Sequence, residues 1–324
     1  MLDQYHRNIQ YLRISVTDRC NLRCIYCMPD QGVEWVAHHE ILSYEQIVRL
    51  AEQFAALGIT HIRLTGGEPL VRPHLHRLVS GLRAVSGIER ISLTTNGVLL
   101  ADQLPKLLDA GLDGVNLSLD TLDPKEYISM TRRDHLADAL KGLEAALAAP
   151  GLTVKLNCVL MERNRSQLVP LASLARTRNL SVRFIEMMPI GLGRTLKSCT
   201  QEDAQSLLTA AFGTPLPCDP PPGAGPSQYM TFSNFTGKIG FISAISHKFC
   251  SQCNRIRLSA AGHLKTCLQY EPGLNLKPLL EGNADDAQLR DTLAKAISEK
   301  PACHHFADGA QEHDEISNMN QIGG

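Results

Sequence analysis

The sequence has little excess charge, few aromatic residues and no long hydrophobic run. Its 32 lysines and arginines nearly balance its 33 aspartates and glutamates, which leaves a formal net charge of −1 over 324 residues. This balance gives no overall reason to expect a nucleic acid or an anionic membrane surface as a partner. No apolar stretch approaches the roughly 20 residues that span a bilayer, and the N-terminal MLDQYHRNIQ lacks the apolar core of a signal peptide. We therefore expect a cytoplasmic protein that binds neither nucleic acid nor membrane.

Cysteine, by contrast, is plentiful, with 10 in the chain. Thiols stay reduced in the cytoplasm, so this number favours metal or redox chemistry over disulfides. Hydrophobic residues make up 44% of the chain and charged residues 20%, which is ordinary for a globular protein. A chain of this length can bury the core of one large domain, or of a large and a small one.

The first two thirds of the chain alternate between strand and helix patterns. The expected strands are Tyr11–Thr17, His61–Thr65, Arg90–Thr94, Gly114–Leu119, Thr153–Leu160 and Ser181–Met187. The expected helices are one that Ser43 opens and Gly58 closes, followed by Leu75–Val85, Leu104–Ala110, Leu136–Ala148 and Ser166–Arg178. Gln46 completes a capping box with Ser43. Strands and helices in this order predict a parallel sheet that curls into a full or partial barrel.

The predicted strands have one apolar and one polar face. Apolar and polar residues alternate along them, and the polar positions include Arg13, Arg63, Thr94, Ser118 and Lys155. A parallel sheet buried on both faces would be apolar throughout, so the polar face predicts a wet or ligand-filled interior. An antiparallel sheet with one solvated face is the alternative, and the intervening helices argue against it. Three of the polar residues are cations that suit an anionic ligand.

The last third of the chain has a different character. Residues 213–226, GTPLPCDPPPGAGP, are rich in proline and glycine and predict an extended linker. Two β-hairpins are expected beyond it, with turns near Thr236–Gly237 and at Ala260–Gly262. We therefore expect a barrel domain in residues 1–212 and a smaller β-rich domain in residues 227–324. The polar C-terminal end, NQIGG, predicts a flexible tail.

Three cysteines, Cys20, Cys24 and Cys27, lie within the stretch TDRCNLRCIYCMPD. Structural zinc needs four ligands, so this set suits it only if a distant His or Cys joins. A four-iron cluster held by three thiolates instead leaves one iron open to a ligand from outside the protein. The spacing alone favours a cluster over zinc only modestly.

A second set of three, Cys250, Cys253 and Cys267, lies on the second predicted hairpin and just before it. Taken alone it favours a zinc site completed by His247 or His263. The set nevertheless repeats the pattern of three thiolates, now beside two arginines at positions 255 and 257.

The cysteine stretch, together with LTGGEP at residues 64–69, resembles the radical S-adenosylmethionine superfamily. Further stretches, among them LTTNG, VNLSLDTLD, VKLNCVLM, RFIEMMPIG, FCSQCNRIRLS and the terminal IGG, extend the resemblance over nearly the whole chain. This combination closely resembles the GTP 3′,8-cyclase family. The resemblance implies an incomplete (β/α)6 barrel, a smaller C-terminal β-rich domain, two [4Fe–4S] clusters and S-adenosylmethionine as cofactors.

The resemblance also implies roles for individual residues. The first cluster falls on Cys20, Cys24 and Cys27, and the auxiliary cluster on Cys250, Cys253 and Cys267. Contacts to S-adenosylmethionine fall on Tyr26, Gly67, Glu68, Ser118, Asn157 and Met188. Contacts to GTP fall on Arg13, Arg63, Thr94, Lys155, Arg255, Ile256 and Arg257. Catalytic roles fall on Arg255, Arg257, Gly323 and Gly324.

The implied reaction is radical cyclisation of GTP to (8S)-3′,8-cyclo-7,8-dihydroguanosine 5′-triphosphate, the first step of molybdenum cofactor biosynthesis. It needs an external electron donor, and its product passes to a downstream cyclic pyranopterin monophosphate synthase. The oligomeric state stays open, with a homodimer among the alternatives. The rival hypotheses are a radical enzyme that modifies RNA or a peptide, and a zinc-stabilised interaction protein. Cys158 is interpreted as a core residue, whereas Cys199 and Cys218 receive no role. The stretch that contains Cys303, His304, His305 and His313 could bind metal weakly, but it is interpreted as a solvated tail segment.

Metal content tests the two-cluster hypothesis. Two four-iron clusters predict roughly eight irons per chain after anaerobic reconstitution. Changing Cys250, Cys253 and Cys267 to Ser should halve this number, because the first set is untouched, and reductive cleavage of S-adenosylmethionine should survive in part. Stoichiometric zinc in the reconstituted protein would contradict the hypothesis.

Overall fold

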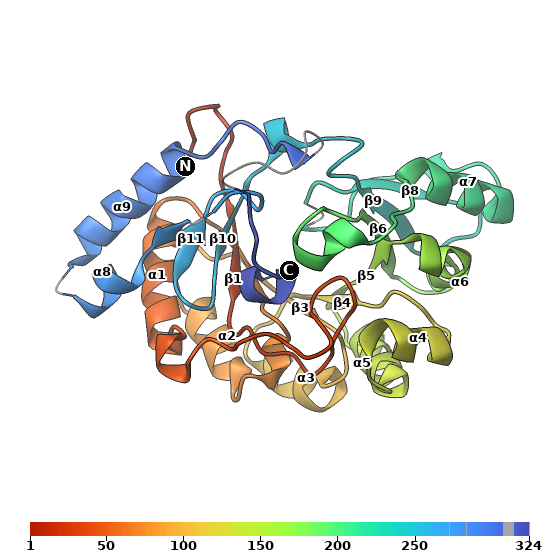
Figure 1. Cartoon of the computed structure of the whole chain (residues 1–324), viewed down its shortest axis with the longest axis horizontal. Coiled ribbons are helices and arrows are strands. Elements are labelled where there is room, and N and C mark those ends of the chain that lie inside the picture. Colours follow the sequence, from red (N-terminus) through yellow and green to blue (C-terminus); the bar gives the residue numbers. More distant parts are fainter. Residues whose placement is uncertain (224, 272, 283, 307–313, 324) are drawn as a thin grey trace.

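The computed structural model describes residues 1–223, 225–271, 273–282, 284–306 and 314–323. A run of parallel strands forms the centre of one twelve-stranded sheet (Figure 1). These strands are β1 (Tyr11–Ser15), β2 (His61–Thr65), β3 (Arg90–Thr95), β4 (Gly114–Ser118), β5 (Thr153–Leu160) and β6 (Ser181–Glu186). Each joins its neighbour in chain order through parallel pairing. The predicted strands are confirmed, and the antiparallel alternative is wrong for this part of the chain.

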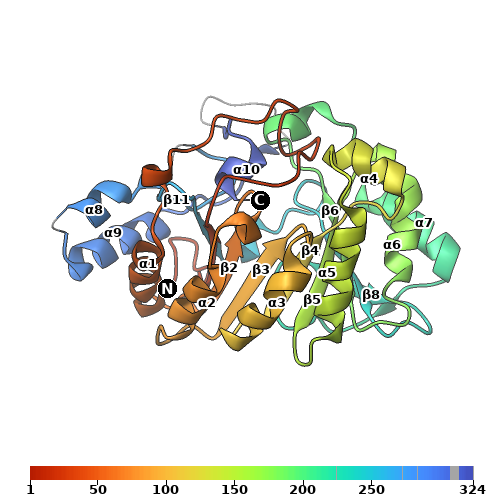
Figure 2. The same ribbon diagram turned by 90° about the horizontal axis from the view of Figure 1, so that it is seen from below.

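Helices cover the outer face of these strands. They are α1 (Tyr44–Ala56), α2 (Leu75–Arg83), α3 (Leu100–Asp109), α4 (Pro124–Thr131), α5 (Leu136–Ala148), α6 (Leu168–Ser173) and α7 (Gln201–Phe212). Figure 2 shows α2, α3 and α5 lying outside the strands. The Ser43–Gln46 capping box is confirmed at the start of α1. The sheet is not closed, so the barrel is incomplete, as predicted.

Two helical predictions differ from the structure, and two helices were not predicted. Helix α3 begins at Leu100, four residues before the predicted start, and includes Pro105 in its interior. The expected helix over residues 166–178 is split into a 3-10 turn, Glu162–Gln167, and the short α6. Helices α4 and α7 were not predicted, although Asp123 followed by a proline, and a Thr200 capping box, mark where they begin.

The C-terminal third adds strands to both ends of this sheet. These are β7 (Leu216–Pro217), β8 (Gln228–Thr231), β9 (Lys238–Ile242), β10 (Arg255–Leu258), β11 (His263–Lys265) and β12 (Leu274–Asn275). Strand β9 pairs with β6 and β10 with β1, both in parallel. The two predicted hairpins are confirmed as β8–β9 and β10–β11. A domain boundary at residue 212 stays a prediction, because the strands on its two sides share one sheet.

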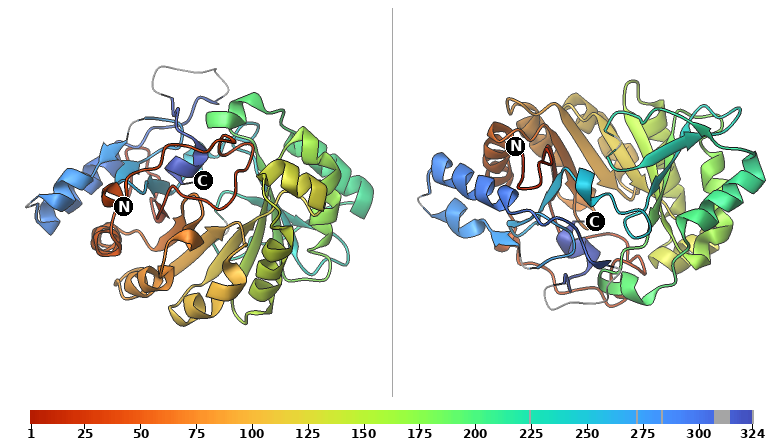
Figure 3. Two further views of the ribbon diagram at one scale, coloured as in Figure 1. Left: turned by 60° about the horizontal axis from the view of Figure 1, so that its bottom comes forward. Right: turned by 90° about the horizontal axis from the view of Figure 1, so that it is seen from above.

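Short helices complete the described chain. They are α8 (Lys277–Glu281), α9 (Asp286–Ser298), α10 (Met319–Ile322) and the 3-10 turns His38–Glu40, Pro69–Val71, Gly191–Thr195 and Cys250–Gln252. Helix α9 packs beside α1, where Arg49 and Asp286 form an ion pair of 2.9 Å. Figure 3 shows the helices as an outer arc, with α10 on the concave side of the sheet. None of the helices in the described ranges is long and apolar enough to cross a membrane.

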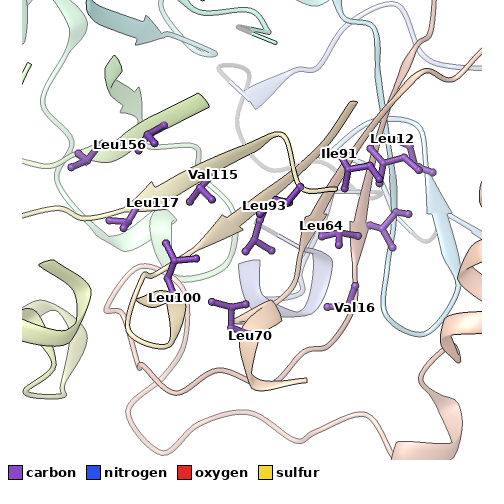
Figure 4. Packing of buried hydrophobic residues seen from close by; sticks show 14 of the residues in the cluster. Leu12, Val16, Leu64, Leu70, Ile91, Leu93, Leu100, Val115, Leu117 and Leu156 are labelled. Atoms are coloured by element: carbon purple, nitrogen blue, oxygen red, sulfur yellow. The ribbon is translucent and has the colours of Figure 1, made fainter. Parts of the chain in front are cut away.

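The hydrophobic core lies between the strands and the outer helices. Its strand residues include Leu12, Leu64, Leu93, Leu117 and Leu156, and all of them are fully buried. Figure 4 shows these side chains in one layer with those of the flanking segments. Burying one such side chain contributes about 1.5–3 kcal/mol. The apolar face thus anchors the helices, which leaves the polar face of the same strands to line the interior.

Candidate active site

A cavity of about 300 Å³ opens where the parallel strands end. Side chains at strand ends line it, and so do the loops that carry both cysteine sets. In parallel sheets, ligands bind at the carboxyl ends of the strands, because the loops that follow them converge there. The cavity is lined by all six cysteines of the two predicted sets, Cys20, Cys24, Cys27, Cys250, Cys253 and Cys267.

The first cysteine set lies on the loop after β1. A tight turn joins Cys24 and Cys27, because the amide of Cys27 donates to the carbonyl of Cys24 at 2.9 Å. The backbone nitrogen of Leu22 lies 3.3 Å from the sulfur of Cys20, and the side-chain amide nitrogen of Asn96 lies 3.9 Å from the same sulfur. N–H groups aimed at sulfur stabilise a thiolate and, in an iron–sulfur site, tune its potential.

The thiols of this set are protonated in the metal-free chain. Burial raises the pKa of Cys24, and the neighbouring Cys27 and Cys20 raise it further. Burial also raises the pKa of Cys20 to about 11 and that of Cys27 to about 12. Iron must therefore displace three protons on binding, which couples loading of this site to pH.

The second set lines the same cavity from the segments before β10 and after β11, and it differs in charge. Burial tends to raise the pKa of Cys253, but Arg255 and Lys300 outweigh it and lower that pKa to about 7. Burial raises the pKa of Cys267. The neighbouring cations thus favour thiolate at one ligand position before any metal binds.

The GGEP stretch is held by the cysteine loop through its backbone. The Gly67 amide donates to the Thr17 carbonyl, and the Glu68 amide donates to the Arg19 carbonyl, both at 2.8 Å. A Cβ atom on Gly67 would lie 2.4 Å from the Arg19 carbonyl oxygen. The glycine is therefore required for packing against the cysteine loop, a reason that the sequence did not reveal. Gly67 also lines the cavity, so its predicted contact to S-adenosylmethionine stays a prediction.

Glu68 is engaged with the protein itself. Its carboxylate accepts hydrogen bonds from the Thr95 hydroxyl and the Asn96 amide, both at 2.7 Å, and from the Leu70 amide at 3.0 Å. Burial raises its pKa to about 7. These bonds tie the end of β2 to the end of β3. The geometry supports a positioning role for Glu68 in addition to the predicted ligand contact.

Tyr26 contacts a carboxylate that received no role from the sequence. Its hydroxyl donates to Asp120 at 2.8 Å, and the other Asp120 oxygen accepts from the Val159 amide, also at 2.8 Å. Burial raises the pKa of Asp120 to about 6. The sequence feature that could have identified Asp120 is its position just after β4, at the end of the strand where ligands bind. The remaining predicted cofactor contacts, Ser118, Asn157 and Met188, all line the cavity.

Three predicted substrate residues bring half-buried positive charge to the cavity. Arg13, Arg255 and Arg257 line it together with Thr94. They meet because β10 pairs with β1 in a register that sets Arg257 opposite Arg13. Burial, followed by Arg13 and Arg255, lowers the pKa of Arg257. The Ile256 side chain instead lies in the hydrophobic core, so only its backbone is available to a ligand.

Arg63 and Lys155 lie outside this cavity, beside a separate small cavity of about 10 Å³. Arg63 lies over the ring of Tyr11 at 5.2 Å. The Lys155 ammonium nitrogen lies 2.7 Å from the carbonyl oxygens of both Pro222 and Gly223 in the proline-rich linker. The linker thus contacts the substrate face predicted from the strand pattern.

Arg183 is a buried cation that the sequence reasoning missed. It lies on β6, is 2% exposed, and donates to the side-chain oxygens of Asn116 and Asn157 at 2.6 Å. Its alternation with Val182 and Phe184 was the available signal. Arg183 connects two strands on the polar face and adds to the positive charge there.

The end of the chain reaches the arginines. The Gly323 carbonyl accepts a hydrogen bond of 2.6 Å from Arg257. The side-chain amide of Asn320 donates a hydrogen bond of 3.1 Å to the Asp18 carbonyl. Gly323 has φ of 75°, and a Cβ there would lie 2.8 Å from the Thr65 hydroxyl. The predicted tail therefore packs at the strand ends as far as Gly323. Gly324 lies outside the described residues.

Sequence comparisons match both halves of the chain. Residues 14–175 match the Radical SAM superfamily, and residues 180–306 match Molybdenum Cofactor Synthesis C. A GTP 3′,8-cyclase of Pelotomaculum thermopropionicum is 43% identical, and one of Heliobacterium modesticaldum is 44% identical. Each alignment covers 100% of both chains. The chain belongs to the GTP 3′,8-cyclase family.

Solved structures confirm the barrel. Streptococcus suis SuiB bound to S-adenosylmethionine matches with a TM-score of 0.60 at 14% identity, over 90% of this chain and 68% of that one. Native anSMEcpe with bound AdoMet matches with a TM-score of 0.50 at 19% identity, over 63% of this chain and 60% of that one. These likenesses concern the fold alone.

The cofactors of this radical family are two [4Fe–4S] clusters and S-adenosylmethionine. The residues present fit this pair of clusters, because each set offers three free thiols at one cavity. Among the described residues, no three metal-ligating side chains converge on a single ion. Thiolates of a cluster bind different irons and need no such convergence. His247 and His263, which would complete a zinc site, do not line the cavity.

Lys155 generates a prediction about pH. Burial, followed by Arg183 and Arg63, lowers its pKa from 10.5 to about 6. Between these two pH values the unfolded chain binds a proton that the folded chain does not, so stability rises with pH. We expect Lys155→Met to flatten this rise in ligand-free protein, as measured by urea unfolding from pH 6.5 to 9.

The control for this experiment is Lys141→Met, because Lys141 is exposed and forms only a surface ion pair with Asp102. Its removal should leave the slope of stability against pH unchanged. Identical slopes for wild-type protein and Lys155→Met would show that Lys155 keeps its proton in the folded chain.

Proposed function

We propose that this chain cyclises GTP to (8S)-3′,8-cyclo-7,8-dihydroguanosine 5′-triphosphate, with S-adenosylmethionine and an external reductant. The observation that carries this proposal is one cavity lined by both cysteine sets and by three half-buried arginines, Arg13, Arg255 and Arg257. Full-length similarity to GTP 3′,8-cyclases supports the same conclusion. This reaction is the first step of molybdenum cofactor biosynthesis.

The two cysteine sets would hold the two clusters at opposite sides of the cavity. When bound, the clusters and S-adenosylmethionine supply the electron transfer and radical chemistry of the reaction. The first set, Cys20, Cys24 and Cys27, would serve S-adenosylmethionine, and the second, Cys250, Cys253 and Cys267, would serve the guanine. Tyr26, Gly67, Glu68, Ser118, Asn157 and Met188 are the proposed contacts of S-adenosylmethionine.

The arginines would orient the substrate between these two sides. Arg13, Arg255 and Arg257 face one volume, and no acidic side chain forms an ion pair with any of them in the described residues. Half-buried cations without counter-ions bind phosphate oxygens well, because they have lost part of their hydration and form charge-assisted hydrogen bonds to an anion. The remaining proposed GTP contacts are Arg63, Thr94, Lys155 and the Ile256 backbone. GTP that is fixed in this way has already lost conformational entropy on binding, so the entropic part of the barrier to cyclisation is smaller.

The C-terminal tail would cover the part of the cavity that Arg257 lines. Gly323 holds Arg257 through its carbonyl group, and Gly324 follows it in the chain. A chain end without side chains can pass between strand ends that admit no Cβ atom. We infer that this contact orients Arg257 and restricts water at the reacting nucleoside.

The finer partners follow from the reaction. A reduced electron carrier would load the first cluster, and a cyclic pyranopterin monophosphate synthase would use the product. The near-neutral charge of the chain supports the expectation that it binds neither nucleic acid nor membrane. A cytoplasmic location is part of the same proposal. A homodimer is an additional hypothesis.

Product analysis after anaerobic incubation with GTP, S-adenosylmethionine and dithionite tests the function. We expect the cyclic dihydro nucleotide with wild-type protein. Losing one charge-assisted contact costs about 1.5–3 kcal/mol, so Arg257→Ala should weaken GTP binding at least about tenfold and leave S-adenosylmethionine affinity almost unchanged. The control is Arg178→Ala, which removes only a surface ion pair. Absence of the cyclic product from iron-replete wild-type protein would refute the proposal.

Gly323 offers a sharper test of the tail than truncation alone. Gly323→Ala places a Cβ against Thr65 and strains a positive φ, so we expect product formation to be lost at unchanged iron content. Deleting Gly323 and Gly324 should have the same effect. The control is Gly151→Ala, which has the same φ of 75° with no atom within 4 Å of the added Cβ. Full turnover by the truncated protein would make the tail an ordinary chain end.

A further inference from the structure

A fourth cysteine lines the cavity at the auxiliary side. Cys303 is a free, half-buried thiol, and the cavity lining includes it together with Cys250, Cys253 and Cys267. It lies 36 residues after Cys267 in the sequence and belongs to neither cysteine motif. Its place beside a site that has three thiolates and one open iron raises the question of whether it completes that site.

Arg7 holds the segment before Cys303 against Cys250. One nitrogen of its guanidinium donates to the carbonyl oxygens of both Cys250 and Ala302, each at 2.9 Å. The second terminal nitrogen donates to the Pro301 carbonyl at 2.7 Å. A buried ion pair of 2.6 Å with Asp3 orients the guanidinium. Because one donor atom serves both carbonyls, the backbone next to Cys303 lies close to the first ligand of the auxiliary site.

The other side of the segment is held by the residues that follow β11, among which Cys267 lies. The Tyr270 hydroxyl donates to the Cys303 carbonyl at 3.0 Å. The Lys300 ammonium group donates to the Thr266 carbonyl and, at 3.1 Å, to the Arg255 carbonyl. The backbone of Cys303 is therefore held between the segment that contains Cys250 and the segment that contains Cys267.

The next residue gives an independent sign that a ligand belongs here. His304 lines the cavity and is 7% exposed, yet neither of its ring nitrogens has a hydrogen-bond partner in the described part of the chain. Burial lowers its pKa, and the Ala244 backbone group, which approaches the ring without reaching hydrogen-bond geometry, raises it by a smaller amount. Buried polar groups are nearly always hydrogen-bonded, so a neutral imidazole in this position points to a partner that the loaded cavity supplies.

We propose that Cys303 provides a fourth thiolate to the auxiliary cluster while GTP is absent, and that GTP displaces it. The inference rests on the proposed function, since it takes GTP as the displacing ligand. Ligation forms one iron–sulfur bond and releases the thiol proton. Displacement breaks that bond and forms the bond to the guanine, and the released thiolate takes up one proton from water. No electron is transferred in this exchange.

The physical reason is local concentration. A thiol whose backbone is held beside the three auxiliary ligands would compete with solvent as an intramolecular ligand of the cluster. The same ligand must be displaced by substrate, so it lowers the apparent affinity for GTP by the ratio of closed to open sites. Cys303 would thus protect the empty cluster at the cost of weaker GTP binding.

The test uses anaerobically reconstituted holoprotein in which Cys303 is replaced by Ala or, to keep the side-chain size, by Ser. Iron content must equal that of wild-type protein. In dithionite-reduced protein without GTP, electron paramagnetic resonance spectra of wild type and Cys303→Ala should differ, and saturating GTP should make them coincide. The alanine variant should bind GTP about tenfold more tightly, since no ligand is displaced. The control, Cys218→Ser in the linker, should behave as wild type in both measurements.

Thiol alkylation of the wild-type holoprotein gives a second measurement. Iodoacetamide should label Cys303 of the holoprotein slowly without GTP and faster with it, while labelling of Cys218 stays constant. Identical spectra without GTP, together with equal labelling in both states, would overturn the proposal. A spectral difference without GTP that GTP fails to remove would support Cys303 as a ligand and overturn GTP as the molecule that displaces it.

Discussion

Buried positive charge on the inner face of the sheet is the constraint on which the site depends. Arg13, Arg63, Arg183 and Arg257 are all enclosed by the barrel, and burial lowers the pKa of each of them. Enclosing charge without a counter-ion costs several kcal/mol per group. The fold can bear this cost because the opposite face of the same strands buries a continuous apolar layer. An anionic substrate then recovers much of the cost on binding.

Strand pairing between distant parts of the chain brings the two halves of the site together. Because β10 lies beside β1, Arg257 is set opposite Arg13, and the auxiliary cysteines face the first cysteine loop across one cavity. The chain ends reinforce this arrangement, since Arg7 binds the segment 301–302 and Gly323 binds Arg257. The auxiliary side is therefore built from the N-terminus, β10 and the last residues at once.

Much of the sheet and several residues of the site could be predicted from residue patterns. Alternation in the strands identified Arg13, Thr94 and Ser118 as interior residues, and all three line the cavity. The same pattern would have identified Arg183, which was overlooked. It could not show that Lys155 contacts the linker, because that contact joins segments whose approach depends on the path of the whole chain. The role of Glu68 in tying two strand ends was likewise hidden.

By itself, the sequence determined the order of the parallel strands, most of the helices between them, the apolar and polar faces and the two cysteine sets. These properties depend on neighbours a few residues apart, where the periods of strands and helices act. Only the tertiary structure decided that the C-terminal strands extend both ends of one sheet, that Gly67 must lack a Cβ and that Cys303 lies beside the auxiliary set. Such contacts arise from packing between distant segments, and local periodicity carries no information about them.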